Sequence, residues 1–199
     1  MSFEHLQADV VRLLEHWDAP TAELNDVREE YLAHLAVHPD AVSRDGVSDH
    51  LTCGGFVFDP RLEHVALIMH RKARLWLQPG GHFESDDAGV IDAAVREVRE
   101  ETGLPVDDAN AMIVDLHHHQ LSAAFGRCTS HRDVRVAIVL DEPAECVVSE
   151  ESDAAAWWPV DAIPQPTDPE LPATVLRIRD LLARRAGRQS APAAAPSRS

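Results

Sequence analysis

Residues 80–104 read GGHFESDDAGVIDAAVREVREETGL, and this segment carries the strongest structural signal in the chain. Glu97, Glu100 and Glu101 stand at positions i, i+3 and i+4, so on a helix their carboxylates share one face. Carboxylates this close together repel one another unless a cation neutralises them, and Mg²⁺ prefers oxygen ligands. The opposite face is apolar and suited to packing on a core; it carries Ile91, Ala94, Val95 and Val98.

An ordinary amphipathic helix with a solvated acidic face is the competing interpretation, because most charge runs are solvated. Two features favour a metal site instead. Gly103 predicts the helix C-cap, so the glutamates lie at the end where the helix dipole disfavours negative charge. The pair Gly80–Gly81 follows a hydrophobic strand, where a glycine lets the backbone approach another group closely.

The segment resembles the Nudix box, which reads G-x5-E-x7-R-E-U-x-E-E-x-G-U with U aliphatic. Gly81 matches the leading glycine, and residues 96–104 match the second half without a mismatch. Fourteen residues separate Gly81 from Arg96, one more than the box allows, and we place the extra residue in the loop 85–87. The usual glutamate position then falls on Asp87 or on Ala88. The GGHxE start is similar to a sub-branch of the family that has a slightly longer loop.

This resemblance implies an α/β fold of the Nudix type, an α/β/α sandwich around a mixed sheet. It also implies hydrolysis of the pyrophosphate bond in a nucleoside diphosphate linked to another group, with Mg²⁺ or alternatively Mn²⁺ as the cofactor. The implied metal ligands are Glu97, Glu100, Glu101 and the carbonyl of Gly80, and Arg96 would orient a glutamate.

The general base is not fixed by the box. Glu101 is the first choice for this role, and Glu150 or Glu151, on a later loop, is the second. A base must lie within about 3 Å of the attacking water, directly or through one relay. The tertiary structure has to show which acid does so.

Four further residues are candidates for substrate binding, each with an ordinary alternative. His82 and Glu84 lie in the box loop, where they could touch a phosphate, brace the loop or simply face solvent. His131 and Asp133 lie in a stretch that resembles a segment of the same sub-branch and could line the substrate pocket. His117 and His119 alternate on a strand and could jointly hold a metal, or could be polar strand-end residues.

Composition excludes several classes of function. The formal net charge of −16 argues against a nucleic-acid polymer as the partner, although bound cations would still permit a small phosphate substrate. No apolar run approaches about 18 residues, and the N-terminus lacks the features of a secretory signal, so we expect a cytoplasmic protein. The three cysteines form no CxxC pair, which favours small buried hydrophobic side chains over a metal knuckle or a disulfide.

The chain divides into three expected parts. Helical spacing over residues 3–17 and 21–37 predicts an N-terminal helical hairpin in residues 1–40, with a role in packing or in a homodimer contact. Residues 41–186 form the expected catalytic domain, and residues 187–199, rich in Ala, Pro and Ser, a disordered tail. Within the domain we predict strands near 49–58, 63–69, 75–78, 111–119, 132–140 and 155–160, and helices near 88–102 and 169–186.

Two other functions remain open. One is a narrower enzyme that removes oxidised or noncanonical nucleoside triphosphates. The other is a non-catalytic module that binds a nucleotide. The module is the weakest of the three hypotheses, because such modules commonly lose box glutamates and this chain retains all three.

Overall fold

The computed structural model describes residues 3–121, 127–149 and 152–189. Its centre is a seven-stranded sheet with the path β3-β2-β1-β6-β5, to which β4 and β7 attach through β1 and β2. The pair β1–β6 is parallel and every other pair is antiparallel, so the predicted mixed sheet is confirmed. The strands are β1 (Asp49–Phe58), β2 (His64–His70), β3 (Leu75–Leu77), β4 (Gly80–Gly81), β5 (Ala111–Gln120), β6 (Ser130–Val139) and β7 (Ser152–Pro159).

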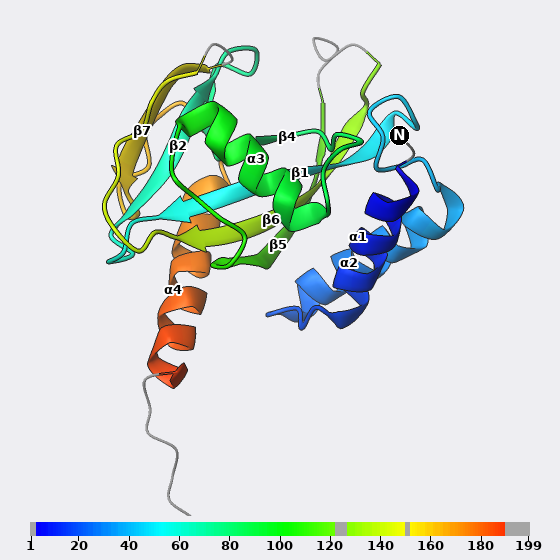
Figure 1. The fold of residues 1–199 in the computed structure, drawn as a ribbon, viewed down its shortest axis with the longest axis horizontal. Helices are drawn as coiled ribbons and strands as arrows, with labels where there is room; N and C mark the ends of the chain where they lie inside the picture. The colour runs from blue at the N-terminus through cyan, green and yellow to red at the C-terminus, as the bar shows by residue number, and fades with distance from the viewer. Residues whose placement is uncertain (1–2, 122–126, 150–151, 190–199) are drawn as a thin grey trace, which may run out of the picture.

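Helices cover both faces of this sheet, as Figure 1 shows. Strand β1 is buried on both sides because its residues alternate between two hydrophobic clusters. Val57 packs with the box helix α3, whereas Phe56 and Phe58 pack with α4. The predicted α/β/α sandwich is therefore confirmed. The helices are α1 (Glu4–His16), α2 (Ala22–Val37), α3 (Val90–Thr102) and α4 (Leu171–Gln189).

The N-terminal hairpin α1–α2 packs on the same cluster as α3. Leu6, Val10 and Leu14 form the buried stripe of α1, at the helical spacing that the sequence shows. The Tyr31 hydroxyl of α2 donates a hydrogen bond to the backbone carbonyl of Asp133, at 3.2 Å. The predicted helical pair is thus present, and its buried side chains extend the hydrophobic core.

The ends of the helices agree closely with the sequence pattern. Gly103 ends α3 in the left-handed conformation, with φ of 65°, and its N–H bonds the carbonyl of Arg99. This is the predicted C-cap. Helix α4 continues to Gln189, three residues into the segment expected to be disordered, and residues 190–199 lie outside the described chain. Among the described helices, none is both long and apolar enough to cross a membrane.

Candidate active site

Two adjacent glycines bring the box loop against the sheet and against α3. Gly80 has a φ of +158°, and a Cβ there would lie 2.4 Å from the carbonyl oxygen of Cys53 on β1. A Cβ on Gly81 would lie 2.7 Å from Oε1 of Glu97. Glycine is required at Gly80 because a side chain would collide with the backbone of β1, whereas a side chain at Gly81 would displace the Glu97 carboxylate. The leading glycine of the box therefore makes room for Glu97.

Arg96 connects the box loop to the acidic face of α3. Its Nε and Nη2 donate to the two carboxylate oxygens of Asp87, at 2.7 and 3.1 Å. Its Nη1 donates to Glu97 at 3.0 Å and to Glu100 at 3.1 Å, and Nη2 also bonds the carbonyl of His82 at 2.9 Å. Although partial burial opposes the charge, the Asp87 and Glu97 carboxylates raise the pKa of Arg96 above its ordinary value.

The sequence leaves Asp87 and Ala88 as alternatives for the box glutamate position. In the structure Asp87 forms an ion pair with Arg96. Only 3% of Asp87 is exposed, and its Oδ2 also accepts the backbone N–H of Glu84 at 2.7 Å. Asp87 thus bonds the backbone of the box loop and also Arg96, the residue that orients the glutamates.

The three box glutamates differ in exposure and in what they contact. Glu97 and Glu101 are buried, whereas the Glu100 side chain is 57% exposed. Oε2 of Glu101 accepts the N–H of Gly80 at 2.8 Å. All are oxygen donors, which fits a hard divalent cation. Among the described residues, no three donor atoms of the box acids lie within 4.8 Å of one another, and Arg96 and the Gly80 amide hold their carboxylates.

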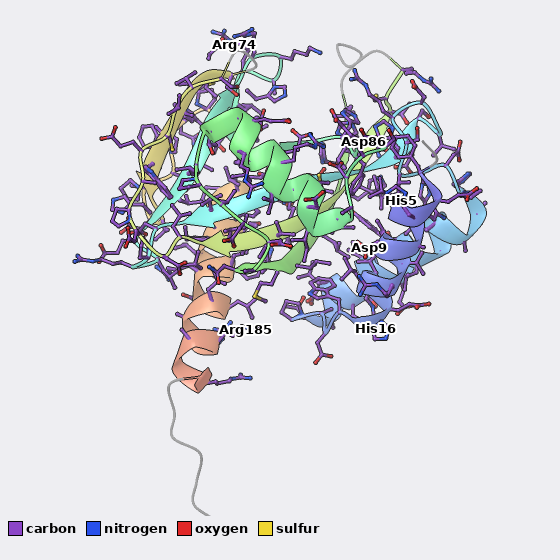
Figure 2. All side chains as sticks on the ribbon, viewed as in Figure 1. His5, Asp9, His16, Arg74, Asp86 and Arg185 are labelled. Carbon is purple, nitrogen blue, oxygen red and sulfur yellow. The ribbon has the colours of Figure 1, made fainter. Side chains whose placement is uncertain are left out.

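Helix α1 supports the start of α3 in a way that the sequence does not indicate. The N-cap residue of α3, Gly89, has no side chain to cap the helix. Instead Oδ2 of Asp9 accepts the N–H of Val90 at 2.9 Å, and His5 bonds the carbonyl of Asp87 at 2.8 Å. In Figure 2 the labels of His5, Asp9 and Asp86 mark this junction between α1 and the box loop. The hairpin therefore holds the loop that carries the predicted site.

The two histidines predicted to bind substrate point toward each other and toward a third histidine. Nε2 of His82 lies 3.1 Å from Nε2 of His50, and the rings of His82 and His131 are 5.2 Å apart. Burial, followed by the neighbouring imidazoles, lowers the pKa of His82 to about 3. Burial also lowers the pKa of His131 to about 4. Glu84, in contrast, is exposed on the loop.

Asp133 is buried and already paired. It accepts a hydrogen bond from the Thr52 hydroxyl and forms an ion pair with Arg135 at 3.2 Å. Burial alone would raise its pKa, but the hydrogen bonds and the guanidinium hold the pKa below its ordinary value. His117 and His119 do share a face, with stacked rings 5.2 Å apart, and Arg135 donates to His117 at 2.7 Å. The guanidinium thus takes the single lone pair of His117 Nδ1, which leaves that nitrogen unable to bind a metal.

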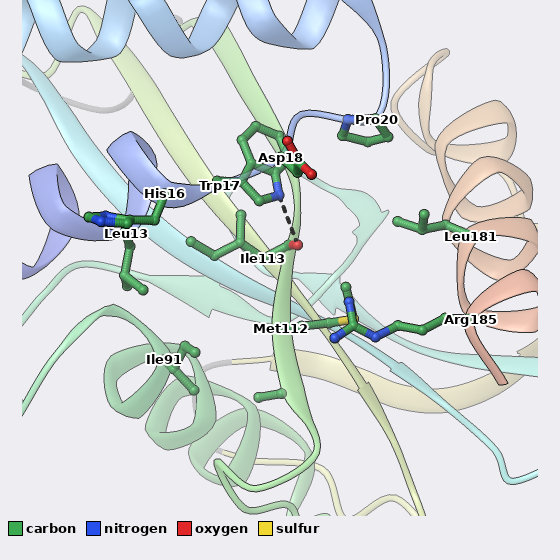
Figure 3. A pocket seen from close by; sticks show the side chains of 11 residues that line it. Leu13, His16, Trp17, Asp18, Pro20, Ile91, Met112, Ile113, Leu181 and Arg185 are labelled. Carbon is green, nitrogen blue, oxygen red and sulfur yellow. Dashed lines mark hydrogen bonds between the residues drawn. The ribbon is translucent and has the colours of Figure 1, made fainter. Parts of the chain in front are cut away.

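Glu150 and Glu151, the second choice for the general base, lie outside the described residues. A cavity of about 430 Å³ lies elsewhere, between α1, β5 and α4, and Figure 3 shows its lining. Ile91 is the only residue of α3 that lines the cavity. Trp17, which also lines it, donates a hydrogen bond from its indole N–H to the carbonyl of Ile113, at 3.1 Å. None of the predicted site residues that the structure describes lines this cavity.

Comparison with known proteins agrees with this geometry. A family model described as the NUDIX domain matches residues 49–177, which is well over half of the chain. The chain belongs to the NUDIX family, and it is an enzyme of the pyrophosphohydrolase class. Enzymes of this family generally use a divalent metal ion.

Solved structures show the same fold. The NUDIX domain of Shewanella oneidensis NrtR, in complex with ADP ribose, has a TM-score of 0.54 and 16% identity, and covers 75% of this chain and 97% of that one. The E. coli dihydroneopterin triphosphate pyrophosphohydrolase has a TM-score of 0.53 and 17% identity, and the match covers 67% of this chain and 95% of that one. A MutT NUDIX hydrolase from Burkholderia pseudomallei has a TM-score of 0.51 and 22% identity, and the match covers 64% of this chain and 96% of that one. No curated protein matches the chain.

Proposed function

We propose that this enzyme hydrolyses the pyrophosphate bond of a nucleoside diphosphate linked to another group, with Mg²⁺ as the cofactor and Mn²⁺ as a substitute. The network around Arg96 carries this proposal. One guanidinium contacts two of the box glutamates and a buried aspartate, and this fixes the acidic face of α3 opposite the Gly80–Gly81 loop. An acidic face held in this way is suited to a divalent ion.

The residues have separate roles in the proposed reaction. Glu97, Glu100, Glu101 and the Gly80 carbonyl would hold the ion. When bound, Mg²⁺ offsets the charge on the phosphate oxygens and lowers the pKa of a bound water. Arg96 keeps Glu97 and Glu100 oriented, which lowers the reorganisation needed in the transition state.

Glu101 is our choice for the general base, since it is buried beside the loop and its carboxylate is oriented by the Gly80 amide. A carboxylate in this position would accept the proton of the attacking water as the bond to phosphorus forms. The P–O–P bridge then breaks, which yields a nucleoside monophosphate and a phosphorylated second group. Glu150 or Glu151 in this role is the alternative.

A panel of nucleotides tests the proposal. ADP-ribose, a nucleotide sugar, a dinucleoside polyphosphate and an oxidised nucleoside triphosphate would be incubated with the enzyme, with Mg²⁺ or with a chelator. We expect a nucleoside monophosphate from a diphosphate-linked substrate, only with metal, and a strongly reduced rate for Glu101→Gln.

The products separate the hypotheses. Release of inorganic pyrophosphate from the triphosphate alone would support the narrower triphosphate-removing enzyme. Binding without turnover of any compound would support the non-catalytic module.

The control variant for Glu101→Gln is Asp86→Asn, which changes an exposed acid of the box loop. It should hydrolyse the substrate at the rate of the wild type.

A further inference from the structure

Four metal-binding side chains meet beside the box loop although they come from distant parts of the sequence. His50, His82, Cys128 and His131 each offer one donor atom, and all four atoms lie within 4.8 Å of one another. His50 is in β1, His82 follows β4, and Cys128 and His131 flank the start of β6. Their meeting follows from the sheet, because His50 and His131 are direct partners in the parallel pair β1–β6. We call these four residues the His3Cys cluster.

The distances within the His3Cys cluster suit a tetrahedral ion. With Zn–N bonds of about 2.0–2.1 Å, two nitrogen ligands of a tetrahedron lie about 3.3 Å apart. Nε2 of His50 and Nε2 of His82 are 3.1 Å apart. The rings of His50, His82 and His131 are mutually 5.0 to 5.2 Å apart, so the three imidazoles surround a common point.

The hydrogen bonds of the cluster also indicate a ligand. Nδ1 of His50 lies 3.1 Å from the carbonyl oxygen of Val47, which can only accept, so Nδ1 carries the proton. The unprotonated Nε2 of His50 therefore offers its lone pair, in this structure to His82. Nε2 of His131 is buried and has no hydrogen-bond partner. Buried polar atoms are nearly always bonded, so this nitrogen indicates a partner of another kind. A backbone carbonyl that fixes the tautomer of a ligating histidine is the usual support for a metal.

We propose that the His3Cys cluster binds one Zn²⁺ ion in a closed, structural site. Three imidazoles and a thiolate are the ligands that zinc prefers, whereas Mg²⁺ takes oxygen ligands, so this site is chemically distinct from the acidic face of α3. Four protein ligands complete a tetrahedron and leave no position for a substrate. The thiolate and nearby Asp133 favour a bound cation, and nearby Arg44 opposes it.

The proposed zinc site would fix the box loop from a second side. The His82 carbonyl is already held by Arg96, at 2.9 Å, and its imidazole would be held by the ion. Through His82 the ion would join the box loop to β1 and to the start of β6. Its role would therefore be to keep Gly80 and Gly81 in place, independently of which substrate the enzyme uses.

Two other groups of donors in the described chain are weaker candidates. His117, His119 and Asp133 lie close together, but Arg135 bonds both His117 and Asp133. The remaining group is at the turn before β2, where Oδ1 of Asp59 already accepts two backbone N–H groups. Both groups offer three donors, and some of these donors are already bonded, so zinc is expected at the four-ligand His3Cys cluster alone among them.

Metal content is the first test. The full chain would be purified without a metal-affinity tag, and zinc would be measured by mass spectrometry after dialysis with excess Mg²⁺. We expect about one Zn²⁺ per chain in the wild type and an affinity lowered by more than about 100-fold in Cys128→Ser. Cys146→Ser, which changes a half-buried cysteine outside the cluster, should retain the ion. His117→Gln should retain it too.

Cobalt substitution identifies the ligands. With Co²⁺ in place of zinc, the wild type should show the visible bands of a tetrahedral site and a thiolate charge-transfer band, and Cys128→Ser should lose the latter. Thermal melting separates lost binding from misfolding: a chelator should lower the melting temperature of the wild type to that of Cys128→Ser, and should not affect Cys128→Ser.

Three results would overturn the proposal. They are a wild type without zinc after growth in zinc-supplemented medium, equal zinc in Cys128→Ser and wild type, and loss of zinc in His117→Gln with retention in Cys128→Ser. None of these outcomes depends on hydrolytic activity, so the proposed function stands or falls separately.

Discussion

Replacing Asp87 by asparagine tests whether its ion pair with Arg96 holds the box loop. The substitution keeps the shape of the side chain but removes its charge and one of its two acceptor oxygens. In the structure Oδ1 accepts from Nε of Arg96, and Oδ2 accepts from Nη2 of Arg96 and from the N–H of Glu84. Whichever way the amide turns, its NH₂ group faces a donor.

The magnitude follows from burial and from the partners that remain. Breaking a buried ion pair by removing one partner costs about 3–5 kcal/mol. Arg96 is 20% exposed in its side chain and keeps Glu97 and Glu100, so we expect the lower end, about 3 kcal/mol. For a chain of this length that corresponds to a melting temperature lower by about 6–12 °C.

Thermal melting of Asp87→Asn, Asp86→Asn and wild type measures this effect. Asp86 is exposed and adjacent, so its substitution should change stability by less than about 0.5 kcal/mol. We also expect Asp87→Asn to need more Mg²⁺ for half-maximal activity, because Arg96 would orient Glu97 less well. A melting temperature for Asp87→Asn equal to that of Asp86→Asn would refute the reasoning.

Three further outcomes are expected. Glu101→Gln should lower turnover by on the order of 100-fold with an unchanged melting temperature; a near-normal rate would remove Glu101 from the site. Gly81→Ala should raise the Mg²⁺ requirement by about tenfold, since its Cβ would displace the Glu97 carboxylate and metal sites lose about 10–100-fold when their support is disturbed. The control is Gly187→Ala, where a Cβ meets nothing within 4 Å. Because the pKa of His82 is lowered to about 3, the unfolded chain binds the proton more readily. With chelator present, stability that is complete above about pH 6.5 should therefore fall as the pH drops toward 3. Urea unfolding at several pH values should show that His82→Gln loses less free energy of unfolding than the wild type as the pH falls. The same pH dependence in both proteins would contradict this prediction.

The box helix was predictable because its evidence is local. Glu97, Glu100 and Glu101 share a face as a result of the helical repeat, and Gly103 ends the helix because glycine adopts a positive φ without strain. The roles of individual acids were less predictable. Asp87 and Ala88 could not be separated by counting residues, since the extra residue of the loop could be placed on either side.

The cysteines show where a rule based on spacing failed to find a candidate. The absence of a CxxC pair favoured buried hydrophobic thiols; Cys53 and Cys128 are buried, whereas Cys146 is half-buried. The spacing Cys128-x2-His131 was the one available signal of a mixed-ligand cluster, and it is weak without the other two histidines. Those lie in β1 and in the box loop, and no periodicity connects them to Cys128.

The sequence by itself determined the box helix, its acidic and apolar faces, the glycine pair before it and the order of strands and helices. Each of these depends on contacts within a few residues, which a repeat of two or 3.6 residues records. Only the tertiary structure decided that Asp9 caps α3 across 81 residues of chain, that Asp87 pairs with Arg96, and that His50 meets His131. The packing of α1 on α3 creates the first contact and the pairing of β1 with β6 creates the third, and both depend on the whole core. The Asp87–Arg96 pair depends on how the box loop folds back on α3. The Asp9 and His50–His131 contacts arise from the global fold, so the residues that make them carry no local pattern.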